Sequence, residues 1–434
     1  MPAPLQGISP NESGQNQTFR SVTCPFCGLH CDDLMIRNDA GRLTIAANGC
    51  PRAAAGFERV VAADASPQIA GRDATLADAI ARAAELIGKA KLPLYGGLGT
   101  DVEGMRAMMA LADRSGGVVD HVLSNAQYRN VGVLQTRGWI MSTLTETRNR
   151  ADLIVVVGSD LSIHHPRFYE RIASPAEAMF GEAEAKRTIV LLGKGTPAGD
   201  VKGDRIGEVL DLGCAPSDIP GVLAAVRAAL HGAPSTGPVG GIAADTIAHL
   251  AERCRNAHYS VFVWAPQALT FDGADLAVHM IADIVRDLNK TTRSAGLSLG
   301  GNDGIASAAS VCSWQSGYPL RVSFASGAPE FDPYRFEVRR MLAEGEGDLL
   351  VWVALFGPDP SPPPETKLPT IVLGAPGIRL AQAPEVFIPL GTPGLDHGGR
   401  LVRCDNVVSL PLRKLRSTGL ATLPDVAGAI TAAL

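Results

Sequence analysis

The chain has 434 residues, more than one hydrophobic core normally organises, so we expect two to four domains. Its hydrophobic content of 46%, with 47 Gly and 30 Pro, is typical of a globular α/β protein with many turns. The net charge of −5 is mild, and no basic block interleaved with aromatic residues occurs, which argues against nucleic acid as a partner. No apolar stretch reaches membrane-spanning length and no signal-peptide core is visible, so we expect a cytoplasmic protein without a membrane contact.

Four of the 8 cysteines lie close together near the N-terminus, as Cys24, Cys27, Cys31 and Cys50. Thiolates separated by two and by three residues converge on a small volume, and a fourth that arrives beyond a hairpin can close the cage, which is typical of a [4Fe-4S] cluster. Tetrahedral zinc is the less favoured alternative, and an empty site is the third. Clustered thiols without a secretion signal favour a reducing compartment and a metal over disulfides. The other cysteines stand alone and are expected to be small buried apolar residues: Cys214, Cys254, Cys312 and Cys404.

The N-terminal part divides into a tail and a cysteine-containing unit. Residues 1–19 are polar and rich in Pro and Gly, and we expect a mobile tail. Residues 20–62 are expected to form a four-cysteine domain, in which a strand–turn–strand over 34–45 connects the third cysteine to the fourth. The carboxylates of Asp32 and Asp33 are expected to be solvated or to cap a helix.

Residues 63–240 are expected to form an α/β segment. Apolar residues recur at helical spacing over 76–89, and near-continuous apolar runs such as 152–158 predict buried parallel strands. The glycines near residue 97 lack both the Walker lysine and the Gly-x-Gly-x-x-Gly spacing, so we interpret them as a strand–helix turn. The expected helices cover 76–89, 103–115 and 220–230, and the expected strands cover 93–100, 152–158, 188–193 and 209–212.

A Gly-, Pro- and Ser-rich stretch at 232–245 is the expected internal boundary. Residues 241–434 are expected to form a second α/β segment, with a stiff Pro-rich loop at 358–364. The expected helices here cover 247–254 and 274–288, and the expected strands cover 260–264, 348–355, 370–373 and 386–390. The predicted fold is therefore α/β, with a small N-terminal four-cysteine domain and two doubly wound α/β domains with parallel sheets.

Several stretches occur in an order that resembles a known family along most of the chain. Besides the cysteines, they are Leu144-x-Glu146-x-x-Asn149-Arg150-Ala151-Asp152, His165-Pro166-Arg167 with Arg171, residues 284–289, Trp314-x-x-Gly317-Tyr318-Pro319, and residues 391–394 through Arg403-x-Asp405-Asn406-Val407. The plan resembles the molybdopterin-dependent oxidoreductases of the formate dehydrogenase and DMSO reductase kind. Within that superfamily, it is most similar to the B subunit of formylmethanofuran dehydrogenase.

The chain departs from that family at three places that hold its cofactor. In the dehydrogenase, a cysteine or selenocysteine binds molybdenum or tungsten; here no cysteine lies between Cys50 and Cys214, and the corresponding region is 124–130 (SNAQYRN). The family's Gly-x-Asn-Pro turn against the pterin is replaced by residues 158–161, and the acidic turn that meets a guanine is replaced by residues 192–196. The resemblance therefore implies a retained scaffold that has lost the pterin and its metal.

A homologue with this property is the B subunit of the formyltransferase/hydrolase complex of methylotrophic bacteria. That resemblance implies a non-redox structural or docking subunit in one-carbon metabolism, where a formyl group passes from tetrahydromethanopterin to a methanofuran-like carrier and is hydrolysed to formate. The implied partners are an amidohydrolase-like A subunit, a C subunit and a formyltransferase subunit. The alternative is a molybdenum or tungsten oxidoreductase in which Asn125 or Gln127 replaces the metal-binding cysteine.

No catalytic residue is predicted, because no serine lies in a Gly-x-Ser-x-Gly context and no paired carboxylates stand out. His164 and His165 point different ways on any regular element, so a turn is favoured over a metal site. Arg167 and Arg171 lie on one face of a helical segment and are expected either to contact an anionic carrier or to pair with neighbouring acids.

Two further groups of residues are expected to have structural roles only. The loop at 300–304, with Asn302 and Asp303, is expected to be a plain surface loop. Trp314, Tyr318 and Trp352 are expected to anchor the core or an interface.

Overall fold

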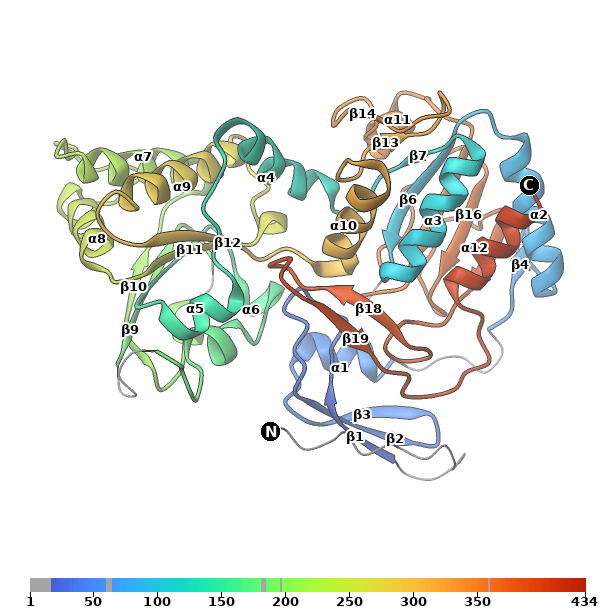
Figure 1. Cartoon of the computed structure of the whole chain (residues 1–434), viewed down its shortest axis with the longest axis horizontal. Helices are drawn as coiled ribbons and strands as arrows, with labels where there is room; N and C mark the ends of the chain where they lie inside the picture. Colours follow the sequence, from blue (N-terminus) through green and yellow to red (C-terminus); the bar gives the residue numbers. More distant parts are fainter. Residues whose placement is uncertain (1–16, 60–64, 181–184, 196, 358–359) are drawn as a thin grey trace.

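The computed structural model describes residues 17–59, 65–180, 185–195, 197–357 and 360–434. Two α/β lobes lie side by side, and a small N-terminal unit lies beneath the junction between them (Figure 1). This unit is a three-stranded antiparallel sheet with one short helix. Its elements are β1 Gln17–Val22, β2 Leu34–Asp39, β3 Arg42–Ala47 and α1 Pro51–Phe57.

The first lobe, which we call the five-strand lobe, contains a parallel sheet in the order β10-β9-β8-β11-β12. This is the 3-2-1-4-5 strand order of a doubly wound sheet, in which ligands bind at the carboxyl ends of the strands where the order reverses. The strands are β8 Leu153–Val157, β9 Arg187–Leu192, β10 Ile206–Leu212, β11 Ser260–Trp264 and β12 Ser294–Ser298. The helices are α4 Ser124–Arg137, α5 Leu144–Arg150, α6 Leu161–His164, α7 Ile219–Leu230, α8 Ala244–Asn256 and α9 Ala274–Leu288.

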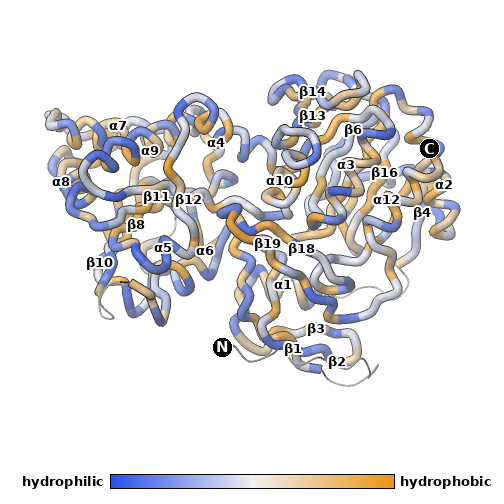
Figure 2. Tube along the Cα trace, viewed as in Figure 1, coloured by the Kyte–Doolittle hydropathy of each residue, from blue (hydrophilic) through white to orange (hydrophobic). Residues whose placement is uncertain are grey.

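Both faces of this sheet are covered, which explains the near-continuous apolar runs of its central strands. One face packs against α7, α8 and α9. The opposite face shares a hydrophobic core with the N-terminal unit, so the cysteine-containing segment is packed onto this lobe. Figure 2 shows hydrophobic residues following the strands inside the lobes, while the outer helices alternate between hydrophobic and hydrophilic residues.

The second lobe, the nine-strand lobe, contains a sheet in the order β14-β13-β7-β6-β15-β16-β17-β4-β5. The five strands from β7 to β17 are parallel, in a 2-1-3-4-5 order, and the outer strands are antiparallel. The strands are β4 Gln68–Ile69, β5 Arg72–Asp73, β6 Pro93–Gly99, β7 Val118–Val119, β13 Val322–Ser323, β14 Glu330–Phe331, β15 Leu349–Ala354, β16 Thr370–Gly374 and β17 Val386–Pro389.

Helices of this lobe cover both faces of its sheet. Four of them form one core with the central strands, and α11 contributes to a smaller core on the opposite face. A separate hairpin, β18 Gly399–Val402 with β19 Ser409–Leu412, runs near the junction of the lobes (Figure 1). The helices are α2 Leu76–Lys89, α3 Val102–Ser115, α10 Ile305–Ser316, α11 Val338–Ala343 and α12 Leu423–Ala432.

The mixed α/β class with parallel sheets is confirmed, but the sheets do not follow the linear division expected near residue 240. The stretch 232–245 joins α7 to α8 on one face of the five-strand lobe, and β11 and β12 beyond it complete that lobe's sheet. The nine-strand sheet combines strands from both sides of this insertion. The linker composition therefore marks a helix–helix loop within one lobe.

The expected N-terminal tail is partly outside the described residues, which begin at position 17. Residues 17–19 belong to β1, which pairs with β2, so the end of that tail is a strand. The predicted strand–turn–strand over 34–45 is confirmed by β2 and β3. Positions 358 and 359 of the predicted Pro-rich loop also lie outside the described residues.

Candidate functional site between the lobes

A cavity of about 490 Å³ lies at the junction of the two lobes. Its walls come from α4, α10 and the segments that follow β11 and β12, at the carboxyl ends of those strands. Ligands of doubly wound sheets bind at the carboxyl ends of the strands, as here, although no residue that directly follows β8 lines this cavity, and the volume is within the range of small-molecule sites. The geometry of the fold alone therefore makes this cavity the first candidate for a functional site.

The described lining of the cavity contains no charged side chain. Its apolar wall includes Leu134, Met141 and Ile305, and its polar groups are neutral amides and hydroxyls. A pterin dinucleotide carries a pyrophosphate, and buried anionic groups need cations or donors to offset their desolvation. The described lining does not fit such a cofactor well.

Two side chains give the cavity specific features. The Nε2 donor of Gln267 is buried and has no hydrogen-bond partner among the described residues. Trp314 lines the cavity but remains 64% exposed, so it stands at the mouth. The expectation that Trp314, Tyr318 and Trp352 anchor the core or an interface is confirmed for Trp352, which is a core residue with 2% exposure. Trp314 and Tyr318 are exposed, and an interface role for them stays a prediction.

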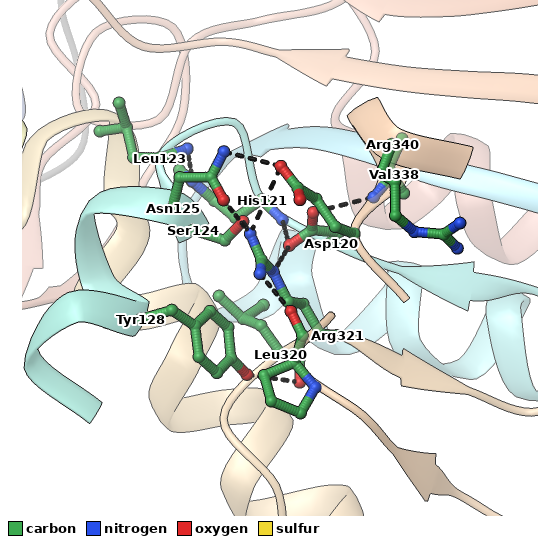
Figure 3. A network of polar contacts seen from close by, with 12 residues as sticks. Asp120, His121, Leu123, Ser124, Asn125, Tyr128, Leu320, Arg321, Val338 and Arg340 are labelled. Carbon is green, nitrogen blue, oxygen red and sulfur yellow. Dashed lines mark hydrogen bonds and ion pairs between the residues drawn. The ribbon is translucent and has the colours of Figure 1, made fainter. Parts of the chain in front are cut away.

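A buried polar network adjoins this cavity where α4 begins (Figure 3). Arg321 is its centre, with 4% of its side chain exposed; it donates to Ser124 Oγ at 3.1 Å and to Asn125 Oδ1. The amide of Asn125 in turn donates to Glu337 Oε1 at 2.7 Å. The Arg321 guanidinium also lies 4.4 Å from the centre of the Tyr128 ring, and the Tyr128 hydroxyl donates to the carbonyl of Pro319 at 2.7 Å.

Asp120 is the buried counter-charge of this network. Its carboxylate lies 3.5 Å from Arg321 Nε and accepts the backbone N–H groups of His121 and Val338 at 2.9 and 3.1 Å. Burial raises the pKa of Asp120 to about 6, although Arg321 and the hydrogen bonds act in the opposite direction.

The network occupies Asn125, one of the two residues considered from the sequence as a replacement for a metal-binding cysteine. Both polar ends of that amide are occupied by Arg321 and Glu337, and Asn125 does not line the cavity. Gln127, the other candidate ligand, does line the cavity. The prediction that Asn125 replaces a metal-binding cysteine therefore lacks structural support.

The four N-terminal cysteines line one enclosed cavity together with Arg167. Burial and the neighbouring thiols raise the pKa of Cys24 well above its ordinary value, and burial raises the pKa of Cys27 to about 12. The pKa of Cys31 is also raised by burial, although Arg171 and Arg167 favour its thiolate. Without a metal these three groups are protonated thiols at neutral pH.

The four thiols are suitable donors for a thiolate-bound group, but the space between them is small. The enclosed volume is about 10 Å³, about the space of one water molecule. As the side chains of the described part are placed, no three His, Cys, Asp or Glu residues form a group that could hold a metal ion. A cluster bound here by Cys24, Cys27, Cys31 and Cys50 would need more space than this volume provides.

Arg167 fastens the N-terminal unit to the five-strand lobe. It forms a two-pronged ion pair with Asp33, with distances of 2.7 and 2.8 Å, and it also binds Glu170. Arg171 binds Asp32 at 2.8 Å. The expectation that both aspartates are solvated or capping groups is therefore wrong for Asp33, whereas Asp32, with 57% of its side chain exposed, is solvated as expected. Burial alone would raise the pKa of Asp33, but its hydrogen bonds to Arg167 and the charge of Arg171 hold that pKa below its usual value.

The loop at 300–304 connects the cysteine unit to the inter-lobe cavity. Asn302 is buried, and its side chain accepts the backbone N–H of Gly28 at 3.0 Å. A Cβ atom on Gly28 would lie 1.9 Å from the carbonyl oxygen of Gly300, so only glycine fits there. The backbone N–H of Cys404 donates to the Gly28 carbonyl at 3.1 Å, and Cys404 also lines the cavity. The prediction of a plain surface loop is wrong because the N-terminal unit covers it.

Three buried histidines lie around these contacts. Burial lowers the pKa of His30 to about 4, that of His121 to about 4 and that of His165 to about 3, so all three are neutral at pH 7. His165 donates through Nε2 to the Gly300 carbonyl at 3.3 Å, which is consistent with the predicted structural role. The burial expected for the four scattered cysteines is also confirmed.

Comparisons with known proteins show to which proteins this chain is similar. No protein-family model matches the chain. The chain is 30% identical to the B subunit of the formyltransferase/hydrolase complex Fhc of Methylorubrum extorquens over 335 residues, 77% of this chain and 87% of that one. It is 27% identical over 426 residues to the B subunit of the tungsten-containing formylmethanofuran dehydrogenase 2 of Methanocaldococcus jannaschii, covering 94% and 96% of the two chains.

A solved structure has the same fold. It is a chain of the formyltransferase/hydrolase complex FhcABCD from Methylorubrum extorquens in complex with methylofuran, with a TM-score of 0.71 and 27% identity. The match covers 85% of this chain and 98% of that one. The chain therefore belongs to the family that comprises the B subunits of formylmethanofuran dehydrogenases and of formyltransferase/hydrolase complexes.

Proposed function

We propose that this chain is the B subunit of a formyltransferase/hydrolase complex and acts as a non-redox structural and docking subunit. Its partners are an amidohydrolase-like A subunit, a C subunit and a formyltransferase subunit. The complex serves one-carbon metabolism by passing a formyl group from tetrahydromethanopterin to a methanofuran-like carrier and releasing formate. The fold is the molybdopterin-oxidoreductase fold, kept as a scaffold.

The observation that carries this proposal is which residues the segment 124–130 contains and what they contact. The family uses this region for its metal-binding cysteine or selenocysteine, and here the segment contains neither. Ser124 and Asn125 instead accept hydrogen bonds from Arg321, so the start of α4 is part of a structural network. A neutral amide does not replace a soft thiolate at a molybdenum or tungsten centre, and the Ser124 hydroxyl already accepts a hydrogen bond from Arg321.

The relatives and the cavity support the same conclusion. The B subunits of the two kinds of complex are similar to this chain at 30% and 27% identity, so identity alone separates them weakly. The uncharged lining of the cavity adds a physical reason to favour the formyltransferase/hydrolase role, since a pterin dinucleotide requires offsetting charge. The molybdenum or tungsten oxidoreductase is the less favoured candidate.

We propose a structural role for the four N-terminal thiols as well. Cys24, Cys27, Cys31 and Cys50 are the residues that would hold a [4Fe-4S] cluster, and such a cluster supplies cross-links to a small unit with little core of its own. Zinc is less favoured. Iron and sulfide analysis of anaerobically purified protein tests this assignment, and protein that contains stoichiometric zinc in place of iron would contradict it.

The docking role is tested by co-expression. The full chain is expressed with and without its three partner subunits, and the products are separated by size-exclusion chromatography. The chain is expected to co-elute with the partners in fixed ratio and, by itself, to show no formylmethanofuran oxidation with viologen dyes. Viologen reduction by the isolated chain, or an active complex that assembles without it, would overturn the proposal.

A further inference from the structure

A second pocket, of about 150 Å³, lies where the N-terminal unit meets the five-strand lobe. It is distinct from the inter-lobe cavity in its lining and in its charge. Three arginines line it, Arg148 from α5, Arg171 from a π-helical turn and Arg403 after β18, with Asp32 as the one acidic residue among the described lining. His30, which is 1% exposed, forms part of the wall.

The segments that supply the arginines are fixed relative to one another. Asp405 accepts both Nε and Nη2 of Arg403, at 2.9 and 2.7 Å, and it also accepts the backbone N–H of Leu144 at 3.0 Å. This ties the turn after β18 to the start of α5. Arg171 is held by Asp32 at 2.8 Å. The pocket is therefore a preorganised feature, assembled from three separate parts of the chain.

The guanidinium groups retain unused donors. No hydrogen bond to Arg403 Nη1 occurs within the residues that the structure describes. Arg148 forms no ion pair with any described acid, and the one hydrogen bond that its guanidinium makes within the described residues is a 3.5 Å contact with the carbonyl of Glu177. Asp405 pairs with Arg403, and Asp32 and Asp33 pair with Arg171, so Arg148 is the one guanidinium of the lining without an acidic partner among the described residues.

The chemistry of the lining selects the occupant. Guanidinium groups present planar forks of N–H donors that match the two oxygens of a carboxylate. Asp32, Asp33 and Asp405 offset the charges of Arg171 and Arg403, which leaves the positive charge of Arg148 without a counter-charge among the described residues. A singly charged carboxylate therefore fits better than a phosphate dianion.

We infer that this pocket, bounded by Arg148, Arg171 and Arg403, binds a single carboxylate group. The carboxylate comes either from a small free acid or from an acidic residue of a polypeptide. The inference does not depend on the proposed role in a formyltransferase/hydrolase complex, because it rests on the geometry of this pocket and not on the segment 124–130 or the inter-lobe cavity.

The test uses the purified full chain and saturation-transfer NMR on the methyl protons of acetate. Total ionic strength is held constant with chloride so that screening does not imitate binding. The wild-type chain is expected to bind acetate saturably. Arg148→Gln is expected to weaken acetate binding about tenfold or more, because it removes charge-assisted donors. Arg150→Gln is the matched control on the same helix; Arg150 pairs with Glu146 outside the pocket, and its substitution should leave binding unchanged.

A second variant separates a binding role from a structural one. Asp32→Asn removes the repulsive carboxylate and is expected to strengthen acetate binding severalfold, which general unfolding would not do. Titration of the capped peptide acetyl-Gly-Glu-Gly-amide distinguishes the two sources: tighter binding of acetate than of the peptide indicates a free acid, and tighter binding of the peptide indicates a polypeptide. Saturation by neither, an unchanged affinity in Arg148→Gln, or displacement of acetate by lower concentrations of phosphate would overturn the inference.

Discussion

Replacing Arg321 with Met tests whether the polar network at the start of α4 stabilises the fold. The substitution keeps an unbranched side chain but removes the guanidinium, which contacts Asp120, Ser124 and Asn125 and stacks over Tyr128. Removing one partner of a buried ion pair typically costs about 3–5 kcal/mol of unfolding free energy. Part of this cost depends on pH, because the carboxyl group of Asp120 can protonate and so avoid remaining as an unpaired buried charge.

The size of the pH-dependent part of this cost follows from the pKa of Asp120, which burial raises to about 6. At pH 5.5 the carboxyl group is largely protonated, so the loss of Arg321 costs less. At pH 8 it must either remain ionised without its partner or be protonated at about 1.4 kcal/mol per pH unit. We therefore expect the penalty of Arg321→Met to be larger at pH 8 than at pH 5.5 by about 1–3 kcal/mol.

The assay is urea unfolding of the full chain, followed by circular dichroism and tryptophan fluorescence at both pH values. Arg339→Met is the matched control, because Arg339 is exposed on α11 and its loss should change stability by no more than about 0.5 kcal/mol. A penalty for Arg321→Met below about 1 kcal/mol, or one that is the same at both pH values, would refute this account of the network.

Three further predictions concern the N-terminal unit and the buried histidines. Gly28→Ala should lower the urea midpoint sharply, because the added Cβ would lie 1.9 Å from the Gly300 carbonyl oxygen. The control Gly132→Ala, in α4 with no atom within 4 Å of the added Cβ, should be neutral or stabilising by about 0.5–1 kcal/mol. Equal midpoints for the two variants would contradict this reasoning. The buried histidines have pKa values of about 3 to 4, below the ordinary 6.5, so the unfolded chain binds more protons than the folded chain below pH 6.5. Stability should therefore fall from pH 6.5 toward pH 4, only partly opposed by the raised pKa of Asp120. A urea midpoint that rises as the pH falls over this range would refute the conclusion that these histidines are buried and neutral. Cys27→Ser should reduce soluble yield and co-elution with the partner subunits, and unchanged values of both would exclude a structural role for the thiols.

Elements with a strong local pattern could be predicted from the sequence. The helices 76–89 and 274–288 and the strand 260–264 were predicted with the bounds observed for α2, α9 and β11. In contrast, α4 has a mostly polar sequence, and α10 consists largely of Ala and Ser without an apolar stripe. These two helices are stabilised mainly by contacts with the rest of the fold, for which no local signal exists.

The site was predictable only where its residues are close in sequence. The spacing of the four cysteines correctly indicated that they line one volume. The Arg321 network was missed because it joins residues about 200 positions apart, and the pairing of Asp33 with Arg167 spans 134 positions. Sheet membership was also misjudged, since a composition change at 232–245 does not reveal which strands pair.

Metal analysis of the native complex tests the central claim, that this chain has kept the scaffold of its family but lost the redox centre. The complex is purified anaerobically with its partner subunits. Mass spectrometry then quantifies molybdenum and tungsten relative to this chain, and extracted pterin is measured in parallel. We expect neither metal above trace level and no pterin dinucleotide. Molybdenum or tungsten at one atom per copy of this chain would contradict the claim.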